Sequence, residues 1–208
     1  YRATDGHGAL MGLLLALMMP PTVPWWVILI GVATAIFVGK QVFGGLGGYP
    51  MHPVAVGWLI LLLSWPNHLY PVESASIAGA HWTVVALTTI CGIALCSSRL
   101  IRWQIPAAIL IGALATSLLL GPWLPGSLTE QFFSGHLMLM AFFMATDATC
   151  SPANKRAMWI YGLGMGFLVI LIRAFGIWPD ATPFALMLMN VLNPLLDRIR
   201  PPTRQVRR

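Results

Sequence analysis

Apolar residues in this chain fall into eight runs, separated by clusters of Pro, Gly and charged side chains. The runs predict helices over residues 8–19, 25–38, 54–64, 82–97, 105–120, 131–145, 158–175 and 184–196. A helix needs about 20 apolar residues to cross a bilayer, so the first, third, sixth and eighth are short. Short segments flanked by Gly or Pro in matching positions of two halves are typical of broken helices in inverted-repeat membrane proteins.

Two stretches of the chain resemble each other. Residues 134–194 begin SGHLMLMAFFMATD, and residues 5–66 begin DGHGALMGLLLA. Aligned with small gaps, the matching pairs are His7 with His136, Trp26 with Trp159, Lys40 with Arg173, and Pro53 with Pro183. The spacing of about 130 residues predicts an internal duplication. Five predicted helices separate the two starts, and an odd number of crossings would turn the second copy upside down.

Composition places the chain in the membrane. Of its 208 residues, 58% are hydrophobic and only 9% are charged, whereas about a quarter of the residues in a soluble domain are charged. We therefore expect an all-α polytopic membrane protein with about eight transmembrane helices in an inverted-repeat bundle. The formal charge of +6 is explained by basic residues at segment ends. The predicted partners are thus the lipid bilayer and protein subunits, with no nucleic acid.

The basic residues also predict an orientation. If all eight segments cross and the tail is cytoplasmic, every one of the 12 Lys and Arg residues except Arg173 lies inside. The same threading places Glu73, Glu130 and Asp180 outside. We expect a multi-pass protein of a bacterial-type inner (plasma) membrane with a cytoplasmic C-terminus.

Four regions follow from this threading. Residues 1–66 form a first, incomplete repeat of three helices, and residues 67–80 form an outer connecting loop. Residues 81–198 form a second repeat of five helices, followed by a basic cytoplasmic tail over residues 199–208. The two helices that would complete the first repeat either precede residue 1 in a longer ancestor or have been lost.

The connection over residues 39–53 is rich in glycine, with Gly44 and Gly45 at its centre and Lys40 at its start. Glycine lets backbone approach a ligand closely, and non-helical backbone at membrane depth is tolerated where protein or a cavity covers it. One interpretation is a cofactor or ion cradle in which Lys40 faces an anionic group. The other is a tight turn between a full helix and a broken one.

Two acidic residues are candidates for an ion pathway. Asp147 and Thr149 lie in a hydroxyl-rich loop after the sixth predicted helix, and Asp180 occupies the equivalent corner of a later loop. Acids at membrane edges are commonly functional, so these residues could coordinate a cation or relay protons. The alternative is that Asp147 simply caps a helix end. The spacing of Cys91, Cys96 and Cys150 does not indicate a metal site.

Several longer motifs carry a family resemblance. They are the DGHGAL opening, GKQVFGGLG, FFMATD followed by SP, and IRAFG with a later LMN. Together they resemble the family of NqrB, from the sodium-pumping NADH:quinone oxidoreductase (Nqr), and RnfD, from the Rnf complex, over about residues 4–201. The resemblance implies a ten-helix inverted-repeat fold in a multi-subunit membrane redox complex, in which this chain matches the last eight helices.

The chain departs from the family at both flavin sites. Family members link flavin mononucleotide to the Thr of a Ser-Gly-Ala-Thr motif, but residues 65–80 contain no Thr, and AGA is followed by His81. The turn of the family usually has two Asn residues associated with a non-covalent flavin, where this chain has Tyr49 and His52. We therefore expect no covalent flavin, and a non-covalent flavin or a quinone held near Lys40, Gly44, Gly45, Tyr49 and His52 stays an open alternative.

Two functions follow as hypotheses. The first is a flavin-less scaffold or quinone-side subunit of an Rnf/Nqr-like electron-transfer complex, without catalytic residues of its own. The second is a conduit for a cation or small solute through the pseudo-symmetric centre, with Asp147 and Lys40 at its entrances. A redox-active version, in which His52, Lys40 or His81 holds a cofactor, is the third alternative.

Overall fold

The computed structural model describes residues 6–45, 47–70, 82–124, 126–133, 135–178 and 180–199. Within these ranges the chain is helical and contains no strand, which confirms the all-α prediction. Glu73, His81 and most of the basic tail lie outside the described residues.

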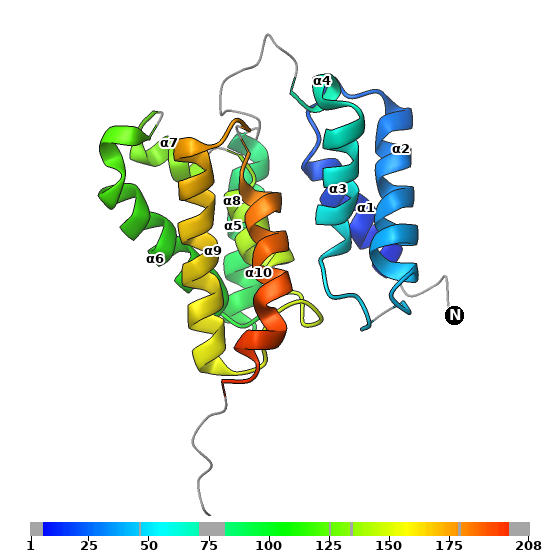
Figure 1. Ribbon diagram of the computed structural model, residues 1–208. Helices are drawn as coiled ribbons and strands as arrows, with labels where there is room; N and C mark the ends of the chain where they lie inside the picture. The colour runs from blue at the N-terminus through cyan, green and yellow to red at the C-terminus, as the bar shows by residue number, and fades with distance from the viewer. Residues whose placement is uncertain are drawn as a thin grey trace, which may run out of the picture.

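The first bundle consists of three main helices and one short one (Figure 1). They are α1 (His7–Leu17), α2 (Trp25–Thr34), which continues as the π-helix η1 (Ala35–Gln41), α3 (Pro53–Ser64) and α4 (Pro66–Leu69). Pro53 and Pro66 each occupy the first helical position, where the missing N–H and the fixed φ of proline suit a helix start. The predicted runs 8–19, 25–38 and 54–64 are therefore confirmed as helices, with ends shifted by a few residues.

The second bundle contains the remaining elements. They are α5 (Trp82–Ser97), α6 (Gln104–Leu119), the 3₁₀ turn η3 (Gly121–Trp123), α7 (Leu128–Phe133), α8 (Leu137–Leu139), the π-helix η4 (Met140–Met144), α9 (Lys155–Phe175) and α10 (Thr182–Leu196). The side chain of Asn154 caps α9 by accepting a hydrogen bond from the backbone N–H of Arg156 at 3.2 Å. The predicted helices of this half are confirmed except for the sixth, which is interrupted.

The sixth predicted helix is broken into α7, α8 and η4. Gly135 has φ of 63° between α7 and α8, a left-handed conformation that glycine adopts without steric penalty. The chain then resumes for one α-turn before widening into η4. This break confirms that the sixth run is a broken helix, although its π-helical half has no signature in the apolar pattern.

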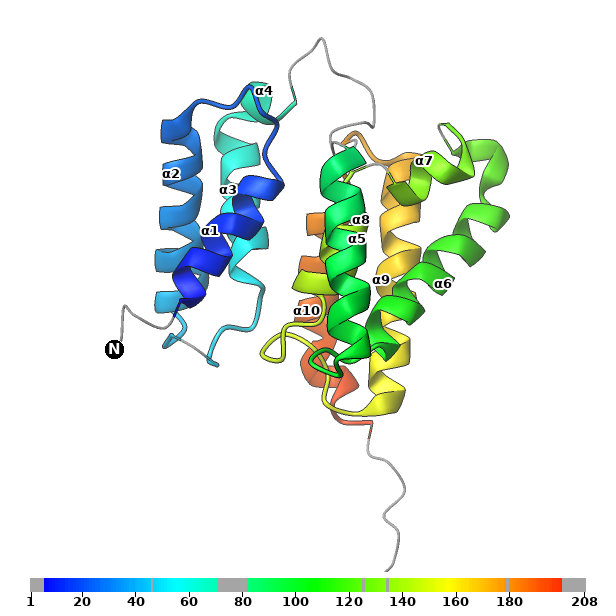
Figure 2. The same cartoon turned by 180° about the vertical axis from the view of Figure 1, so that it is seen from behind.

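Successive long helices alternate in direction in both views of the molecule (Figures 1 and 2). We call the bottom of Figure 1 the lower end; it holds the start of α1, the turn over residues 42–52, the loop over residues 145–154 and the end of α10. The upper end holds α4, α7 and the α9–α10 turn. The alternation places residues from distant parts of the sequence side by side at each end.

Helices α6 and α9 pack closely because glycines line their contact. A Cβ added to Gly166 would lie 2.6 Å from the backbone nitrogen of Ala113, and one added to Gly112 would lie 3.0 Å from Cα of Leu163. Small residues at these positions let two helix backbones approach, as in membrane helix pairs. The α6–α9 pair is therefore a rigid element of the second bundle.

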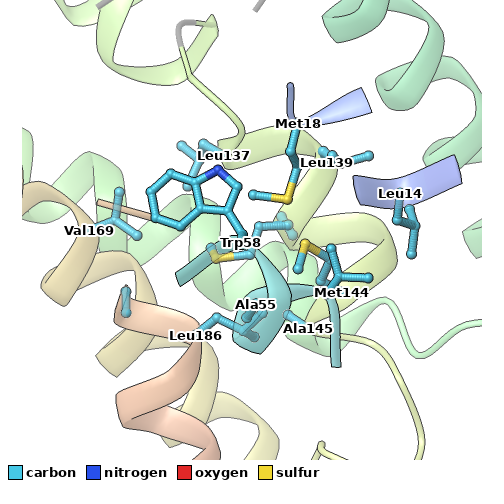
Figure 3. Packing of buried hydrophobic residues seen from close by; sticks show 14 of the residues in the cluster. Leu14, Met18, Ala55, Trp58, Leu137, Leu139, Met144, Ala145, Val169 and Leu186 are labelled. Carbon is cyan, nitrogen blue, oxygen red and sulfur yellow. The ribbon is translucent and has the colours of Figure 1, made fainter. Parts of the chain in front are cut away.

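The largest apolar core lies between the two bundles. Trp58 of α3 is 2% exposed and packs among residues of both halves, including Met18, Leu137 and Leu186 (Figure 3). The Trp58 ring also meets Phe184 of α10 edge-on, with ring centroids 5.9 Å apart. This shared core joins the bundles and positions the polar groups described below.

Length and apolar composition single out one described helix, α9, as able to cross a membrane. Six further apolar helices are shorter, between 10 and 17 residues. The interrupted element α7–α8–η4 accounts for the remaining predicted segment.

Candidate functional site

A group of buried polar residues lies at the lower end, on the seam between the two bundles. We call it the lower cluster: His7, Tyr49 and His52 from the first bundle, and Asp147 from the second. The hydroxyl of Tyr49 donates a hydrogen bond to Oδ2 of Asp147 at 2.9 Å. Nε2 of His7 lies 3.2 Å from the same hydroxyl. Because the hydroxyl hydrogen points toward Asp147, the ring of His7 acts as the donor in that contact.

The glycine-rich turn positions Tyr49 and His52. Gly44 and Gly45 have φ of 96° and 90°, which turns the chain sharply after η1. At the base of the turn, a Cβ on Gly39 would lie 2.7 Å from Cα of Pro53. The close approach of η1 to the start of α3 therefore requires glycine at position 39. The predicted tight turn is present, and it buries Tyr49 to 2% exposure.

Asp147 enters the seam from the loop that follows η4. One carboxylate oxygen accepts from Tyr49, and the other accepts from the backbone N–H of Thr149 at 3.2 Å. The Asp147 side chain is 18% exposed, so it touches water as well as the protein interior. Sγ of the neighbouring Cys150 reaches the backbone oxygen of Tyr49 at 3.8 Å, which adds a second link across the seam.

His52 is the most deeply buried member of the cluster. Its side chain is 1% exposed, and Nε2 lies 3.9 Å from Oδ2 of Asp147. Nδ1 is buried without a hydrogen-bond partner among the described residues. Burial lowers the pKa of His52 to about 4, with the Asp147 carboxylate acting in the opposite direction and His7 adding to the decrease. The imidazole is therefore neutral near pH 7.

Asn190 of α10 and Tyr161 of α9 extend the lower cluster into the second bundle. With its amide nitrogen facing Leu186 and Tyr161, Asn190 accepts the backbone N–H of His52 at 3.0 Å through its carbonyl oxygen. The hydroxyl of Tyr161 lies 2.6 Å from that amide group. Neither residue is among the predicted site residues, although an Asn within the apolar run at residues 184–196 was a signal that could have found it.

A second buried polar group occupies the upper end. We call it the upper cluster: Gln131, His136, Arg173, Asp180 and Thr182. Nδ1 of His136 lies 2.5 Å from Oδ2 of Asp180, and Thr182 donates to Oδ1 through its hydroxyl at 2.5 Å and its backbone N–H at 3.1 Å. Arg173 donates to the backbone oxygen of Gln131 at 2.5 Å.

The upper cluster is an ion-paired unit within the second bundle. Burial raises the pKa of the Asp180 carboxyl, but His136, Arg173 and the Thr182 hydroxyl outweigh that effect and hold the pKa well below its ordinary value. Asp180 is 4% exposed and Arg173 is 5% exposed. The carboxylate is charged and saturated with hydrogen bonds, an arrangement that fixes the α9–α10 turn.

The structure brings together some of the predicted site residues and separates others. Tyr49, His52, Asp147 and Thr149 meet in the lower cluster, whereas Asp180 lies at the opposite end. Lys40 is buried to 7% on η1, while Gly44 and Gly45 lie on the turn below it. The roles predicted for these residues in cofactor binding and ion passage stay predictions.

The lower cluster does not fit a flavin at the turn. The Tyr49 and His52 side chains are 2% and 1% exposed, and the Tyr49 hydroxyl is already paired with Asp147. A flavin bound there would have to displace both rings from the seam. The described residues also contain no cluster of three or more His, Cys, Asp or Glu suited to a metal ion.

Comparison with known proteins identifies relatives of this arrangement. The profile of the NQR2, RnfD, RnfE family matches residues 1–205. The chain belongs to this family. It is 31% identical to the D-type subunit of an ion-translocating oxidoreductase complex from Escherichia fergusonii, over 93% of the chain and 75% of the relative. Proteins of the same name from Alcanivorax borkumensis and Yersinia enterocolitica are 32% and 29% identical, over 93% and 97% of the chain and 73% and 78% of the relatives.

The match also shows that these relatives are longer inside the shared region. It spans 267 positions with the Escherichia fergusonii protein, whereas the whole chain has 208 residues. That relative therefore carries residues within the matched stretch that have no counterpart here. The resemblance inferred from the motifs is thus confirmed.

Proposed function

We propose that this chain is a membrane-embedded subunit of an Rnf/Nqr-like, ion-translocating electron-transfer complex, and that it acts as a flavin-less scaffold or quinone-side subunit. The observation that carries the proposal is the family match over residues 1–205. The names of the relatives describe a subunit of a multi-subunit oxidoreductase, so partner subunits are expected for this chain too.

Exposed apolar side chains support a bilayer environment. Leu29 of α2, Ile90 of α5 and Leu118 of α6 are 59%, 66% and 65% exposed on the outside of the bundles. Soluble proteins rarely expose so many large apolar residues in contiguous patches. We infer that lipid or neighbouring subunits cover these faces, and that the eight segments cross the bilayer.

Helix direction and charge support the predicted orientation. Lys40, Lys155 and Arg198 all belong to the lower end, whereas Glu130 and Asp180 belong to the upper end. We propose that the lower end is cytoplasmic, because basic residues concentrate on the cytoplasmic side of membrane proteins. Labelling of single cysteines in a cysteine-free background tests this: Lys155→Cys and Arg198→Cys should react from one side and Glu130→Cys from the other.

The two three-helix units support an inverted duplication. The α1, α2–η1 and α3 elements align with α8–η4, α9 and α10, and each aligned pair runs in opposite directions (Figures 1 and 2). His7 and His136 accordingly lie at opposite ends, as do Lys40 and Arg173. We propose that residues 1–66 and 81–198 are the two repeats, and that 67–80 replaces a longer connection present in the relatives.

The flavin-less part of the proposal rests on residue chemistry. Residues 65–80 contain no Thr to accept a phosphoester, and Tyr49 and His52 are buried against Asp147 and Asn190. A tagged chain purified from its native membrane should bring the other subunits of the complex with it. After denaturing electrophoresis its band should show no flavin fluorescence, while the band of a relative with the Ser-Gly-Ala-Thr motif should fluoresce. A chain that purifies without other subunits would contradict the subunit role.

A cation conduit is the second candidate function, and the position of Asp147 favours it. This carboxylate touches water and lies on the seam between the bundles. Proteoliposomes containing the chain alone would show cation flux that Asp147→Ala abolishes and Asp197→Ala, an exposed acid at the same end, leaves unchanged. No flux from the wild-type chain would contradict the conduit.

A further inference from the structure

His52 carries a buried polar atom for which the described residues supply no hydrogen bond. Its backbone N–H is held by Asn190, and its side chain is 1% exposed, yet Nδ1 has no hydrogen-bond partner in the described part of the chain. Leaving a buried polar atom unsatisfied costs about 1–3 kcal/mol. A smaller apolar residue at this position would avoid that cost, so the imidazole itself requires an explanation.

Asp147 connects this buried ring to water. Its Oδ2 lies 3.9 Å from Nε2 of His52, and its side chain is 18% exposed. The same oxygen accepts the hydrogen bond from Tyr49, whose hydroxyl also contacts His7. One carboxylate atom therefore faces the buried imidazole, a tyrosine and the solvent side of the seam.

Every element packed against His52 contributes to its electrostatic surroundings. The titratable and polar groups are His7 on α1, Lys40 on η1, Tyr49 on the turn, Asp147 and Cys150 on the loop after η4, Tyr161 on α9 and Asn190 on α10. Asp147 is the acidic member of this set. It is thus the group that favours a positive charge on the ring.

We propose that His52 is a proton-binding site on the seam between the two bundles, and that Asp147 carries the proton between water and the ring. A proton from water binds Oδ2 of Asp147. The carboxyl group then passes it to the imidazole at Nε2, which restores the carboxylate and leaves an imidazolium beside it. Release follows the same steps in reverse, and no electron is transferred.

This inference goes beyond the proposed subunit role, because it depends only on contacts within the chain. It assigns to the lower end a place where charge changes inside the bundle. A buried site that takes up a proton can compensate negative charge that arrives nearby during electron transfer. The seam then becomes a point at which electron flow in a complex could be felt by this subunit.

The test is a histidine titration on the full-length chain. The chain is labelled with ¹⁵N-histidine in detergent, and the His52 signals are assigned by their loss in His52→Gln. In the wild type, His52 should titrate well below the value of about 6.5 for a free histidine. A His52 signal that titrates at the free value would overturn the proposal.

Asp147 variants separate proton transfer from mere packing. Asp147→Asn removes the charge and should lower the His52 titration midpoint by about one pH unit or more, whereas a loosened structure would raise it toward the free value. Asp147→Glu, which keeps a carboxylate, should keep the midpoint near that of the wild type, and Asp197→Asn should leave it unchanged. An unchanged or raised midpoint in Asp147→Asn would refute the role of Asp147. Because no partner subunit is needed, this outcome is independent of whether the chain assembles into a complex.

Discussion

The two polar clusters occupy opposite ends of the molecule and are built on different principles. The upper cluster joins groups from one bundle, with a charged Asp180 held by His136, Arg173 and Thr182. The lower cluster joins two bundles, and its acid, Asp147, meets a tyrosine hydroxyl and a neutral imidazole instead of a basic side chain. Aligned residues of the duplication, His7 and His136, have thus taken up different partners.

This difference separates a structural site from one that can respond. A buried acid with charged and hydrogen-bonding partners is strongly destabilised when one partner is removed. A carboxylate shared across a seam by a few hydrogen bonds is held less firmly and stays in contact with water. We therefore expect substitutions in the upper cluster to affect folding, and substitutions in the lower cluster to affect protonation with smaller changes in stability.

The largest effect is expected from Asp180→Ala. The change leaves His136 and Arg173 buried without their acid, and removing one partner of a buried ion pair costs about 3–5 kcal/mol. Thermal unfolding of the detergent-solubilised chain, followed by helical circular dichroism, measures the loss. Asp197→Ala, at an exposed acid, serves as the control. Similar unfolding temperatures for the two variants would contradict a structural role for the upper cluster.

Gly39→Ala should come next, because it disturbs the base of the lower cluster. The added Cβ would lie 2.7 Å from backbone Cα of Pro53, so η1 and the start of α3 must move apart. We expect a loss of roughly 1–3 kcal/mol, as for overpacked cores, together with a shifted His52 signal in the histidine spectrum. The matched control is Gly121→Ala, whose Cβ would meet nothing within 4 Å. Equal stability of the two variants would mean that the approach of η1 to Pro53 is looser than the structure shows.

Tyr49→Phe should have a moderate effect. It removes the hydroxyl that donates to Asp147 at 2.9 Å but keeps the buried ring, so we expect a loss of about 1 kcal/mol in the same unfolding measurement. The comparison with Asp180→Ala is direct, because each change removes one polar partner from one cluster. If Tyr49→Phe proved as damaging as Asp180→Ala, the distinction between the two clusters would fail.

The smallest effect is expected from Arg102→Gln. Arg102 is exposed at the lower end and donates to the backbone oxygen of Ala153 at 3.1 Å. Exposed surface substitutions usually change stability by no more than about 0.5 kcal/mol, so the unfolding temperature should barely move. A large loss would show that the basic residues of the lower end stabilise the fold as well as its orientation.

Much of the fold was predictable from local pattern, and the exceptions have local causes. The apolar runs predicted residues 82–97 as a helix, and α5 covers the same range. The break in the sixth run arises from the left-handed φ of Gly135, and glycine alone does not reveal whether a helix bends, breaks or continues. The π-helices η1 and η4 widen the backbone without any change in apolar spacing, so no pattern announces them.

The candidate site was predictable only in part. Asp147, Tyr49 and His52 were predicted separately, as a membrane-edge acid and as departures from a family turn. Asn190 and Tyr161 escaped prediction, because a single polar residue in an apolar helix does not indicate which neighbour it meets. His136 was aligned with His7, but its pairing with Asp180 depends on the turn between α9 and α10.

The sequence by itself determined the helical class of the chain, the approximate ends of its helices, the internal duplication and the family, because each depends on the order of residue types along the chain. Tertiary structure alone decided which polar groups meet. Tyr49 and Asp147 are 98 positions apart, and they come into contact only because Trp58 and its neighbours pack the two bundles together. Contacts of that range depend on how whole helices pack, and no local pattern encodes them.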